Sequence, residues 1–217
     1  MRYVCNLKYL LVIFFISSLV FVFFPDIDLA VSKLFYNGNK FPLNNTLFDY
    51  IFYYSIKPII ILISIVSIVI FLYNTFNKKN LFNITKRNIL YLLLILSIGP
   101  GLIVNATLKE NWGRARPLQT IEFGGNKTFT PAFVISNQDG YSFSSGHAAA
   151  AFSLVGISLL MRKRKKTLFT ITFIYAIFVS ISRIAVGGHF LSDVITSFFI
   201  VCISTSFFYK LLIEKDI

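Results

Sequence analysis

Residues 168–213 read LFTITFIYAIFVSISRIAVGGHFLSDVITSFFIVCISTSFFYKLLI and consist of two apolar runs joined by a short polar junction. The runs cover Leu168–Ile184 and Phe190–Ile213. Apolar stretches of about 20 residues are typical of helices that cross a membrane. Ionisable side chains beside such helices are usually functional, and three of them lie in or next to the junction: Arg183, His189 and Asp193.

The composition of the whole chain also indicates a membrane protein. The 217 residues are 56% hydrophobic and 14% charged, and they include 25 phenylalanines. A soluble domain usually carries more charge than this. Six apolar runs predict an all-α integral membrane bundle of six transmembrane helices, in one domain over residues 1–217: Tyr9–Phe24, Ile51–Tyr73, Ile89–Leu108, His147–Met161, Leu168–Ile184 and Phe190–Ile213.

Two of the runs carry features that modify this prediction. Gly99–Pro100–Gly101 interrupts the third run, and we expect a kink there because proline removes a backbone hydrogen-bond donor. The first run resembles a signal peptide, with Arg2 and Lys8 before it, but no small-residue cleavage site ends it. We therefore expect the first run to be retained as a span.

Basic residues between the runs predict the orientation of the bundle, because cytoplasmic loops are enriched in Lys and Arg. If six spans alternate, one side of the membrane collects these residues: Arg2, Lys8, Lys78, Lys79, Lys86, Arg87, Arg162, Lys163, Arg164, Lys165, Lys166, Lys210 and Lys215. Both termini are then cytoplasmic, and the segment 110–146 and the Gly187–Gly188 junction face the other side. This distribution accounts for the net charge of +12 without a nucleic acid partner.

His189 and Asp193 are four residues apart, so a helix that begins at the junction would place them on one face. The carboxylate would then accept a hydrogen bond from one ring nitrogen and leave the other as a nucleophile, which suits attack on a phosphate ester. Gly187 and Gly188 allow a close approach of the backbone. The alternative is a His–Asp pair that only bridges two helices.

The second histidine of the chain, His147, follows Ser145–Gly146 at the start of the fourth run. Serine caps helices, and the free N–H groups of a helix start bind anionic oxygens. A protonated His147 would donate its proton to a departing alkoxide. A simple cap beside an interfacial histidine explains the same residues without catalysis.

Cations complete the predicted site: Lys109, Arg116 and Arg183. Fixed positive charge binds phosphate oxygens and stabilises the charge that develops in the transition state. Arg114 is expected either to contribute to phosphate binding or to contact lipid headgroups. For Lys109 and Arg116, interfacial snorkelling is the alternative. The two histidines and the scattered carboxylates offer no convincing metal-ligand set, so we expect no metal and no cofactor.

Taken together, Lys109–x6–Arg116–Pro117, Ser145–Gly146–His147 and Ser182–Arg183–x5–His189–x3–Asp193 resemble the three-part signature of the type 2 phosphatidic acid phosphatase (PAP2) superfamily. The signature covers residues 109–193, and Ser144 stands where the family commonly has proline. The resemblance implies a metal-independent membrane phosphatase with an acid-phosphatase-like helical core. It implies His189 as the nucleophile, Asp193 as its partner and His147 as the general acid. It also implies a set of phosphate ligands: Lys109, Arg116, Ser145, Gly146 and Arg183.

A narrower resemblance concerns segments around these motifs. Several are similar to the bacterial lipid A 4'-phosphatase branch of the family: Gly99–Asn105, Asn111–Arg114, Phe129–Pro131, Phe133–Ser136 and Gly187–Phe190. Because they surround the motifs, they bear on the substrate. The stretch Asp139–Tyr141 departs from that branch, since it lacks the cysteines found near this place.

The resulting hypothesis is a phosphatase that removes the 4'-phosphate of lipid A through a phosphohistidine, at the periplasmic face of a bacterial inner membrane. The expected partner is a lipid phosphate in the membrane, with no nucleic acid and no obligate protein partner. The catalytic motifs also fit undecaprenyl diphosphate or phosphatidylglycerol phosphate. An anion transporter lined by the same cations is disfavoured, because the ionisable residues gather on one face and form no path across the membrane.

Overall fold

The computed structural model describes residues 6–161 and 163–214. Three of the basic residues used above lie outside these ranges: Arg2, Arg162 and Lys215. Within the ranges the structure is helical, and its only β pairing is an isolated bridge between Thr120 and Lys127. The prediction of an all-α fold is therefore confirmed.

The α-helices are α1 (Leu7–Phe23), α2 (Asp26–Lys33), α3 (Leu47–Phe76), α4 (Lys86–Ser97), α5 (Gly146–Ile157), α6 (Lys165–Ala185) and α7 (Leu191–Leu212). A π-helix, η2 (Ile98–Lys109), continues α4 directly. Short 3₁₀ turns lie between them: η1 (Leu81–Asn83), η3 (Pro117–Gln119), η4 (Ile121–Phe123) and η5 (Ser158–Leu160).

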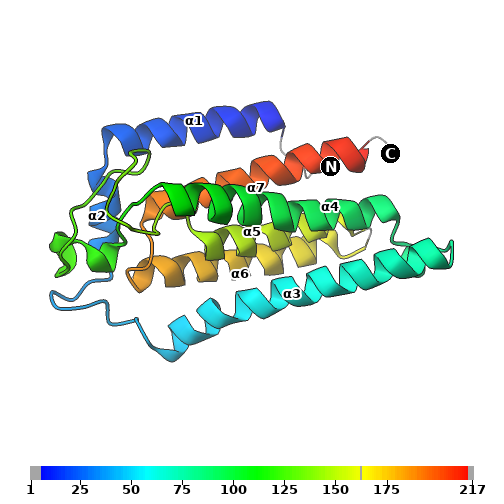
Figure 1. The fold of residues 1–217 in the computed structure, drawn as a ribbon, viewed down its shortest axis with the longest axis horizontal. Helices are drawn as coiled ribbons and strands as arrows, with labels where there is room; N and C mark the ends of the chain where they lie inside the picture. The colour runs from blue at the N-terminus through cyan, green and yellow to red at the C-terminus, as the bar shows by residue number, and fades with distance from the viewer. Residues whose placement is uncertain (1–5, 162, 215–217) are drawn as a thin grey trace.

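The long helices run side by side along the molecule, whereas α2 turns across one end (Figure 1). The bend between α1 and α2 is 84°. α1 begins and α7 ends at the far end of the bundle from α2 (Figure 1). The segments that precede α3, α5 and α7 all lie at the α2 end, and this arrangement brings the predicted motifs to the same end.

Four helices of the described chain are long and apolar enough to cross a membrane: α3, α4 with η2, α6 and α7. The bent pair α1 and α2 gives a fifth candidate. The helix at the fourth predicted run, Gly146–Leu160, is apolar but shorter than a full span. Each of the six apolar runs thus forms a helix, and the chain is a multi-pass membrane protein with four to five candidate spans by length and composition.

The short helix α5 lies at the centre of the bundle and packs against α6, α7 and η2. Ala148, Ala149 and Ala151 are completely buried there, and Phe152 and Leu154 continue the same core. A helix that is apolar on all sides is stable only when other helices enclose it. The small alanine side chains let those neighbours approach closely, which holds the start of α5 in a fixed position.

The Gly99–Pro100–Gly101 sequence changes the helix, as expected, but the change takes the form of a wider π-helix that follows α4 without a break. Asn105 Nδ2 donates a hydrogen bond of 2.7 Å to the Pro100 carbonyl oxygen, five residues earlier. Gly99 lies against α7, where an added Cβ would come within 2.8 Å of Ser204 Oγ. The glycine therefore permits close packing between η2 and α7.

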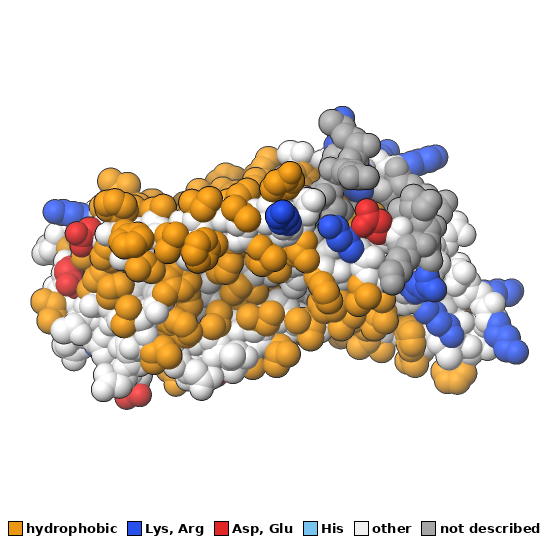
Figure 2. Space-filling view, turned by 90° about the horizontal axis from the view of Figure 1, so that it is seen from above, with side chains coloured by type: hydrophobic (Ala, Val, Ile, Leu, Met, Phe, Trp, Pro, Cys, Tyr) orange, Lys and Arg blue, Asp and Glu red, His pale blue; other side chains and the backbone are white. Residues whose placement is uncertain are grey.

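Charge and hydrophobic surface are separated along the bundle axis. Hydrophobic side chains cover most of the length on the face seen in Figure 2, and Lys and Arg gather at the end away from α2. Large apolar residues of the outer helices are exposed, for example Phe15 at 65% and Leu62 at 62%. Such exposure is expected where lipid covers the protein.

Candidate active site

The three predicted motifs meet at the end of the bundle where α2 lies. The segment 110–145 folds over this end and pairs with itself through backbone hydrogen bonds from Ser136 to Trp112 and from Gly140 to Gly113, of 2.8 and 3.1 Å. The backbone N–H of Ser145 then donates to the carbonyl oxygen of Asp193 at 3.3 Å. These contacts bring the start of α5 and the α6–α7 junction together.

His189 lies in the junction between α6 and α7, just before α7 begins at Leu191. Its backbone N–H donates to the carbonyl oxygen of Arg183 at 3.1 Å, which folds the junction back onto the end of α6. Gly187 has a φ of +68°, and a Cβ at this position would overlap the ring of Phe41. Glycine is therefore required for the tight turn that presents His189.

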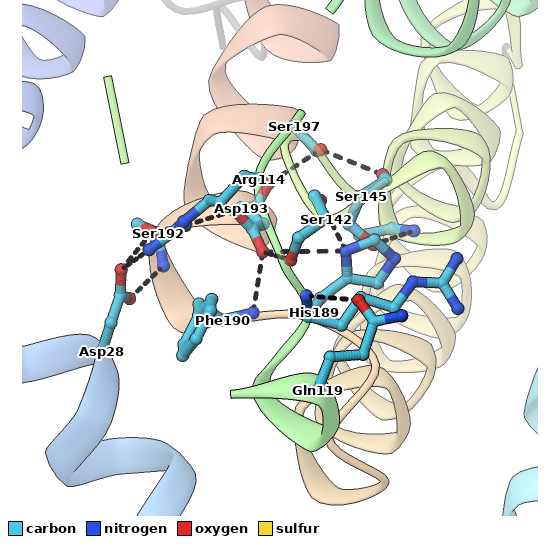
Figure 3. Close-up of polar contacts among 12 residues, drawn as sticks. Asp28, Arg114, Gln119, Ser142, Ser145, His189, Phe190, Ser192, Asp193 and Ser197 are labelled. Carbon is cyan, nitrogen blue, oxygen red and sulfur yellow. Dashed lines mark hydrogen bonds and ion pairs between the residues drawn. The ribbon is translucent and has the colours of Figure 1, made fainter. Parts of the chain in front are cut away.

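The structure fixes the tautomer of the His189 ring. Nδ1 lies 2.8 Å from the carbonyl oxygen of Ser142 (Figure 3). A carbonyl oxygen only accepts hydrogen bonds, so Nδ1 carries the proton and Nε2 keeps its lone pair. The side chain is only 3% exposed, which protects this bond from water.

The expectation that Asp193 itself accepts a hydrogen bond from His189 is wrong. The nearest carboxylate oxygen of Asp193 lies 3.7 Å from Nδ1, beyond hydrogen-bond distance. The expectation rested on a shared helix face, whereas α7 begins at Leu191 and His189 lies outside it. The two side chains therefore form an ion pair only when the ring is charged.

Asp193 is completely buried, and its carboxylate binds two residues next to His189, Ser142 in space and Phe190 in the chain. Its Oδ2 accepts hydrogen bonds from Ser142 Oγ at 2.6 Å and from the backbone N–H of Phe190 at 2.8 Å (Figure 3). Ser142 supplies the carbonyl that binds the ring, and Phe190 follows His189 in the chain. The carboxylate thus positions the imidazole from both sides.

Arg114 is a further part of this arrangement, with a role different from either expected one. Its Nη1 donates to Asp193 Oδ1 at 2.5 Å and to Ser192 Oγ at 2.9 Å, and its Nη2 donates to Asp28 Oδ2 at 2.8 Å (Figure 3). The residue has no exposed surface. Arg114 therefore contacts neither lipid headgroups nor phosphate, and it orients the carboxylate of Asp193.

Aromatic and backbone groups enclose the guanidinium of Arg114. Its Cζ lies 4.3 Å from the ring centroid of Phe190 and 5.6 Å from that of Phe129, and its Nε donates to the Thr130 carbonyl oxygen at 2.8 Å. These residues belong to the segments that resemble the lipid A 4'-phosphatase branch. These segments therefore form part of the site, because they position Arg114, which in turn binds Asp193.

Sequence reasoning did not select Asp28. The bend between α1 and α2 brings this residue against the start of α7, where Oδ1 accepts the backbone N–H of Ser192 at 2.8 Å and Oδ2 accepts Ser192 Oγ at 2.5 Å. Its side chain is 1% exposed. A carboxylate directly after an apolar run was the available signal. Nothing in the local sequence links Asp28 to Ser192, which is 164 residues further along.

Ser145 and Gly146 form the start of α5, as predicted. Ser145 Oγ accepts a 3.5 Å hydrogen bond from the backbone N–H of Ala148 and caps the helix. An added Cβ on Gly146 would overlap the side chain of Asn105 on η2. The first N–H groups of a helix have no partner within it, so this end of α5 offers donors to an anion.

His147 and Arg183 share one aromatic neighbour on α3. The His147 ring stacks on Tyr53 with a centroid distance of 4.4 Å and an angle of 25°. Arg183 Cζ lies 4.7 Å from the centroid of the same tyrosine, and its Nη1 lies 3.2 Å from Asp49 Oδ1. Tyr53 thus connects the expected general acid to an expected phosphate ligand.

The three expected cations lie near the two histidines. Arg116 and Arg183 both act electrostatically on His189 and on Lys109, which is half-buried at the end of η2. The two arginines also line one polar cavity of about 390 Å³. In the described part of the chain no group of three His, Cys, Asp or Glu residues is arranged to hold a metal ion.

This geometry can be compared with known proteins. Residues 90–216, more than half of the chain, match the sequence family described as the PAP2 superfamily. The chain belongs to the PAP2 superfamily. All three signature motifs lie within the matched residues.

Two relatives in the PAP2 superfamily are lipid A 4'-phosphatases. The chain is 34% identical over 214 residues to the enzyme of Francisella tularensis subsp. novicida. The matched region covers 94% of this chain and 95% of the relative. It is 39% identical over 103 residues to the enzyme of Rhizobium leguminosarum. This matched region covers 46% of this chain and 44% of the relative.

The fold is similar to the crystal structure of a transmembrane PAP2-type phosphatidylglycerolphosphate phosphatase from Bacillus subtilis. The TM-score is 0.61 at 22% sequence identity, and the match covers 97% of this chain and 96% of the other. The fold agrees with the family assignment. The family and the relatives show that this chain is a membrane lipid phosphatase.

The protonation of His189 gives a first prediction for this PAP2 phosphatase. Burial lowers the pKa of His189 to about 4, and Arg116 and Arg183 act in the same direction, against the opposing effect of Asp193. A histidine nucleophile acts as the neutral ring, so, with His189 in the expected role, activity should be present above this pKa and lost as the pH falls through it. With a phosphate ester of a good leaving group, which needs no acid, we expect the rate of phosphohistidine formation, corrected for substrate ionisation near pH 6, to stay level to about pH 5. An acid limb at about pH 6.5, the ordinary histidine value, would contradict this expectation.

Asp28 gives a second prediction. The change Asp28→Asn removes one charge from the pair with Arg114, and a charge-assisted hydrogen bond is worth about 1.5–3 kcal/mol. We expect kcat to fall roughly tenfold to a hundredfold with little change in KM, because the substrate does not touch Asp28. Asp26 is exposed on the same short helix, so Asp26→Asn is the matched control. Equal rates for the two variants would show that Asp28 does not support catalysis.

Proposed function

We propose that this phosphatase hydrolyses the 4'-phosphate monoester of lipid A, at the periplasmic face of a bacterial inner membrane and through a phosphohistidine at His189. One observation carries the chemistry: the Ser142 carbonyl oxygen lies 2.8 Å from Nδ1 of His189. It holds the proton on that atom and leaves Nε2 nucleophilic.

In the first half-reaction, Nε2 of His189 attacks phosphorus. A P–N bond forms, the P–O bond to the sugar breaks, and the leaving oxygen takes the proton of His147. The phosphorylated ring carries positive charge, and the carboxylate of Asp193, 3.7 Å from Nδ1, stabilises it. The cations around the ring bind the phosphoryl oxygens: Lys109, Arg116 and Arg183.

In the second half-reaction, water attacks the phosphorus of the phosphohistidine. Neutral His147 accepts a proton from this water, a P–O bond forms, and the P–N bond breaks. The electron pair of that bond returns to Nε2 of His189, and inorganic phosphate leaves. The enzyme is then in its starting protonation state, with the proton of His147 restored.

The role of His147 as the acid depends on the bound substrate. Its ring stacks on Tyr53, whose face attracts positive charge. Before substrate binds, burial and the positive charges of Lys109, Arg116 and Arg183 disfavour the protonated form of His147. A bound phosphate offsets these cations and so favours the protonated ring when the leaving group needs its proton.

Two observations support the substrate and the orientation. The relative that matches nearly the full length of the chain is a lipid A 4'-phosphatase. On the face seen in Figure 2 most of the visible Lys and Arg side chains lie at the end of the bundle away from α2, and cytoplasmic ends of membrane proteins are enriched in such residues. The site then faces the periplasm, where lipid A is accessible.

A substrate panel with purified enzyme tests the proposal. Lipid A, phosphatidylglycerol phosphate and undecaprenyl diphosphate are presented in mixed micelles of the same detergent, and phosphate release is measured. We expect kcat/KM to be at least about tenfold higher for lipid A, which corresponds to about 1.4 kcal/mol of transition-state discrimination, and the 1-phosphate to remain. A higher value for either other lipid would overturn the substrate assignment.

A further inference from the structure

A polar cavity of about 390 Å³ opens beside the expected phosphate site, between the start of α3 and the end of α6. Arg116 and Arg183 form one wall of it. The volume is within the range of about 300–1,000 Å³ that is typical of small-molecule sites. Because two expected phosphate ligands line the cavity, whatever carries the phosphate must lie in it or at its mouth.

The opposite wall is a face of α3 that carries three tyrosines. Tyr50, Tyr53 and Tyr54 line the cavity, and they lie near one another because residues three and four apart share a helix face. The ring centroids of Tyr50 and Tyr54 are 4.5 Å apart, and those of Tyr53 and Tyr54 are 4.9 Å apart. Tyr53 stacks on His147 and is 40% exposed, whereas Tyr50 is 62% and Tyr54 is 57% exposed. Aromatic surface is therefore available to a ligand next to the reacting groups.

Hydrogen-bonding groups lie among these rings. Asp49 lines the same cavity, with its carboxylate bound to Arg183 at 3.2 Å and to the backbone N–H of Asn45 at 3.4 Å. Each carboxylate oxygen retains a further lone pair for a hydroxyl donor. The side chains of Asn44 and Asn45 complete the rim. The cavity thus combines a carboxylate, two amides and a cluster of aromatic rings.

We propose that this cavity is a sugar subsite that binds the pyranose ring carrying the scissile phosphate. The faces of aromatic rings are electron-rich and attract the C–H bonds on the flat side of a sugar. Asp49 and the asparagines receive the hydroxyl and amide groups at the sugar edge. This inference rests on the proposed function, and it identifies the sugar as the group that distinguishes lipid A from the other candidate lipids. The glycerol of phosphatidylglycerol phosphate offers no ring face to Tyr50 and Tyr54.

Interfacial tyrosines also occur as a belt that anchors a protein in the membrane. A belt needs no partly buried carboxylate among its rings, and the side chain of Asp49 is only 14% exposed. A belt residue would also act on every lipid substrate alike. Selectivity between substrates therefore separates the two roles.

The test uses the full-length enzyme with Tyr50→Ala and Tyr54→Ala, singly and together. Phosphate release from lipid A and from phosphatidylglycerol phosphate is measured in the same micelles. We expect the ratio of kcat/KM for lipid A to that for phosphatidylglycerol phosphate to fall about tenfold, mainly through KM for lipid A. Leu47→Ala is the matched control, because Leu47 is 74% exposed at the same end of α3 and does not line the cavity. Its ratio should equal that of the wild type.

The outcomes separate this inference from the proposed function. If the wild type acts on lipid A and the tyrosine variants keep the wild-type ratio, the sugar subsite is wrong and the proposed function stands. A proportional loss on both lipids would also overturn the subsite, since it would indicate a structural or anchoring role. If the wild type releases phosphate from phosphatidylglycerol phosphate but not from lipid A, the proposed function fails and the subsite fails with it.

Discussion

His189→Ala should lower turnover by on the order of 10⁴-fold or more, because in the proposed mechanism Nε2 of His189 forms the bond to phosphorus. The loss should appear in kcat and should be the same with every substrate. Purified wild type mixed with labelled substrate and quenched in alkali should retain label on the protein, and the His189→Ala variant should retain none.

His147→Ala is the matched control for this experiment, since it removes the other histidine of the chain and leaves the nucleophile. With a phosphate ester of a good leaving group, which needs no acid, this variant should still label His189 and should release phosphate slowly. Near-normal turnover by His189→Ala would exclude the phosphohistidine. Label on His189→Ala would show that another residue is the nucleophile.

Asp193→Asn should lower kcat by on the order of 10²–10⁴-fold, comparable to the loss of the orienting carboxylate in other histidine-dependent sites. Asp193 accepts hydrogen bonds from Arg114 on one oxygen and from Ser142 and Phe190 on the other. An asparagine must turn its NH₂ group toward one of these sides, where it meets N–H donors. The segment that holds the His189 ring would then shift.

The measurement for Asp193→Asn combines single-turnover kinetics with thermal unfolding in detergent. We expect phosphorylation of His189 to become slow, and the unfolding temperature to drop because a buried ion pair with Arg114 is lost. A variant that is destabilised but phosphorylates its histidine at the wild-type rate would show that Asp193 supports the fold only. Glu110 is exposed directly after η2, at the same end of the bundle as Asp193. Glu110→Gln therefore controls for the loss of a negative charge at that end.

The apolar runs were sufficient to predict the helices. Leu168–Ile184 and Phe190–Ile213 correspond to α6 and α7 within a few residues at each end. Hydrophobic length is a property of the local sequence, so it can be found without the fold. The fourth run was predicted as a span, but α5 with η5 ends at Leu160 and is enclosed by its neighbours. A helix surrounded by protein does not have to match the membrane thickness.

The contacts that hold the His189 ring could not be read from the sequence. The spacing of His189 and Asp193 suggested a direct bond, but the acceptor is a backbone carbonyl, that of Ser142, which any residue would provide. Arg114 was expected to bind phosphate or to contact lipid headgroups, because a sequence does not show that a guanidinium is enclosed. The partner that explains this burial, Asp28, is on a helix near the other end of the chain.

The most direct test of the central claim is mass spectrometry of lipid A from cells that carry this gene, cells that lack it, and cells with His189→Ala. We predict that lipid A lacks one phosphate, mapped to the 4' position, only in cells with the wild-type gene. Lipid A with the same phosphates in all three strains would contradict the account, and its substrate would then have to be sought among polyprenyl and glycerophospholipid phosphates.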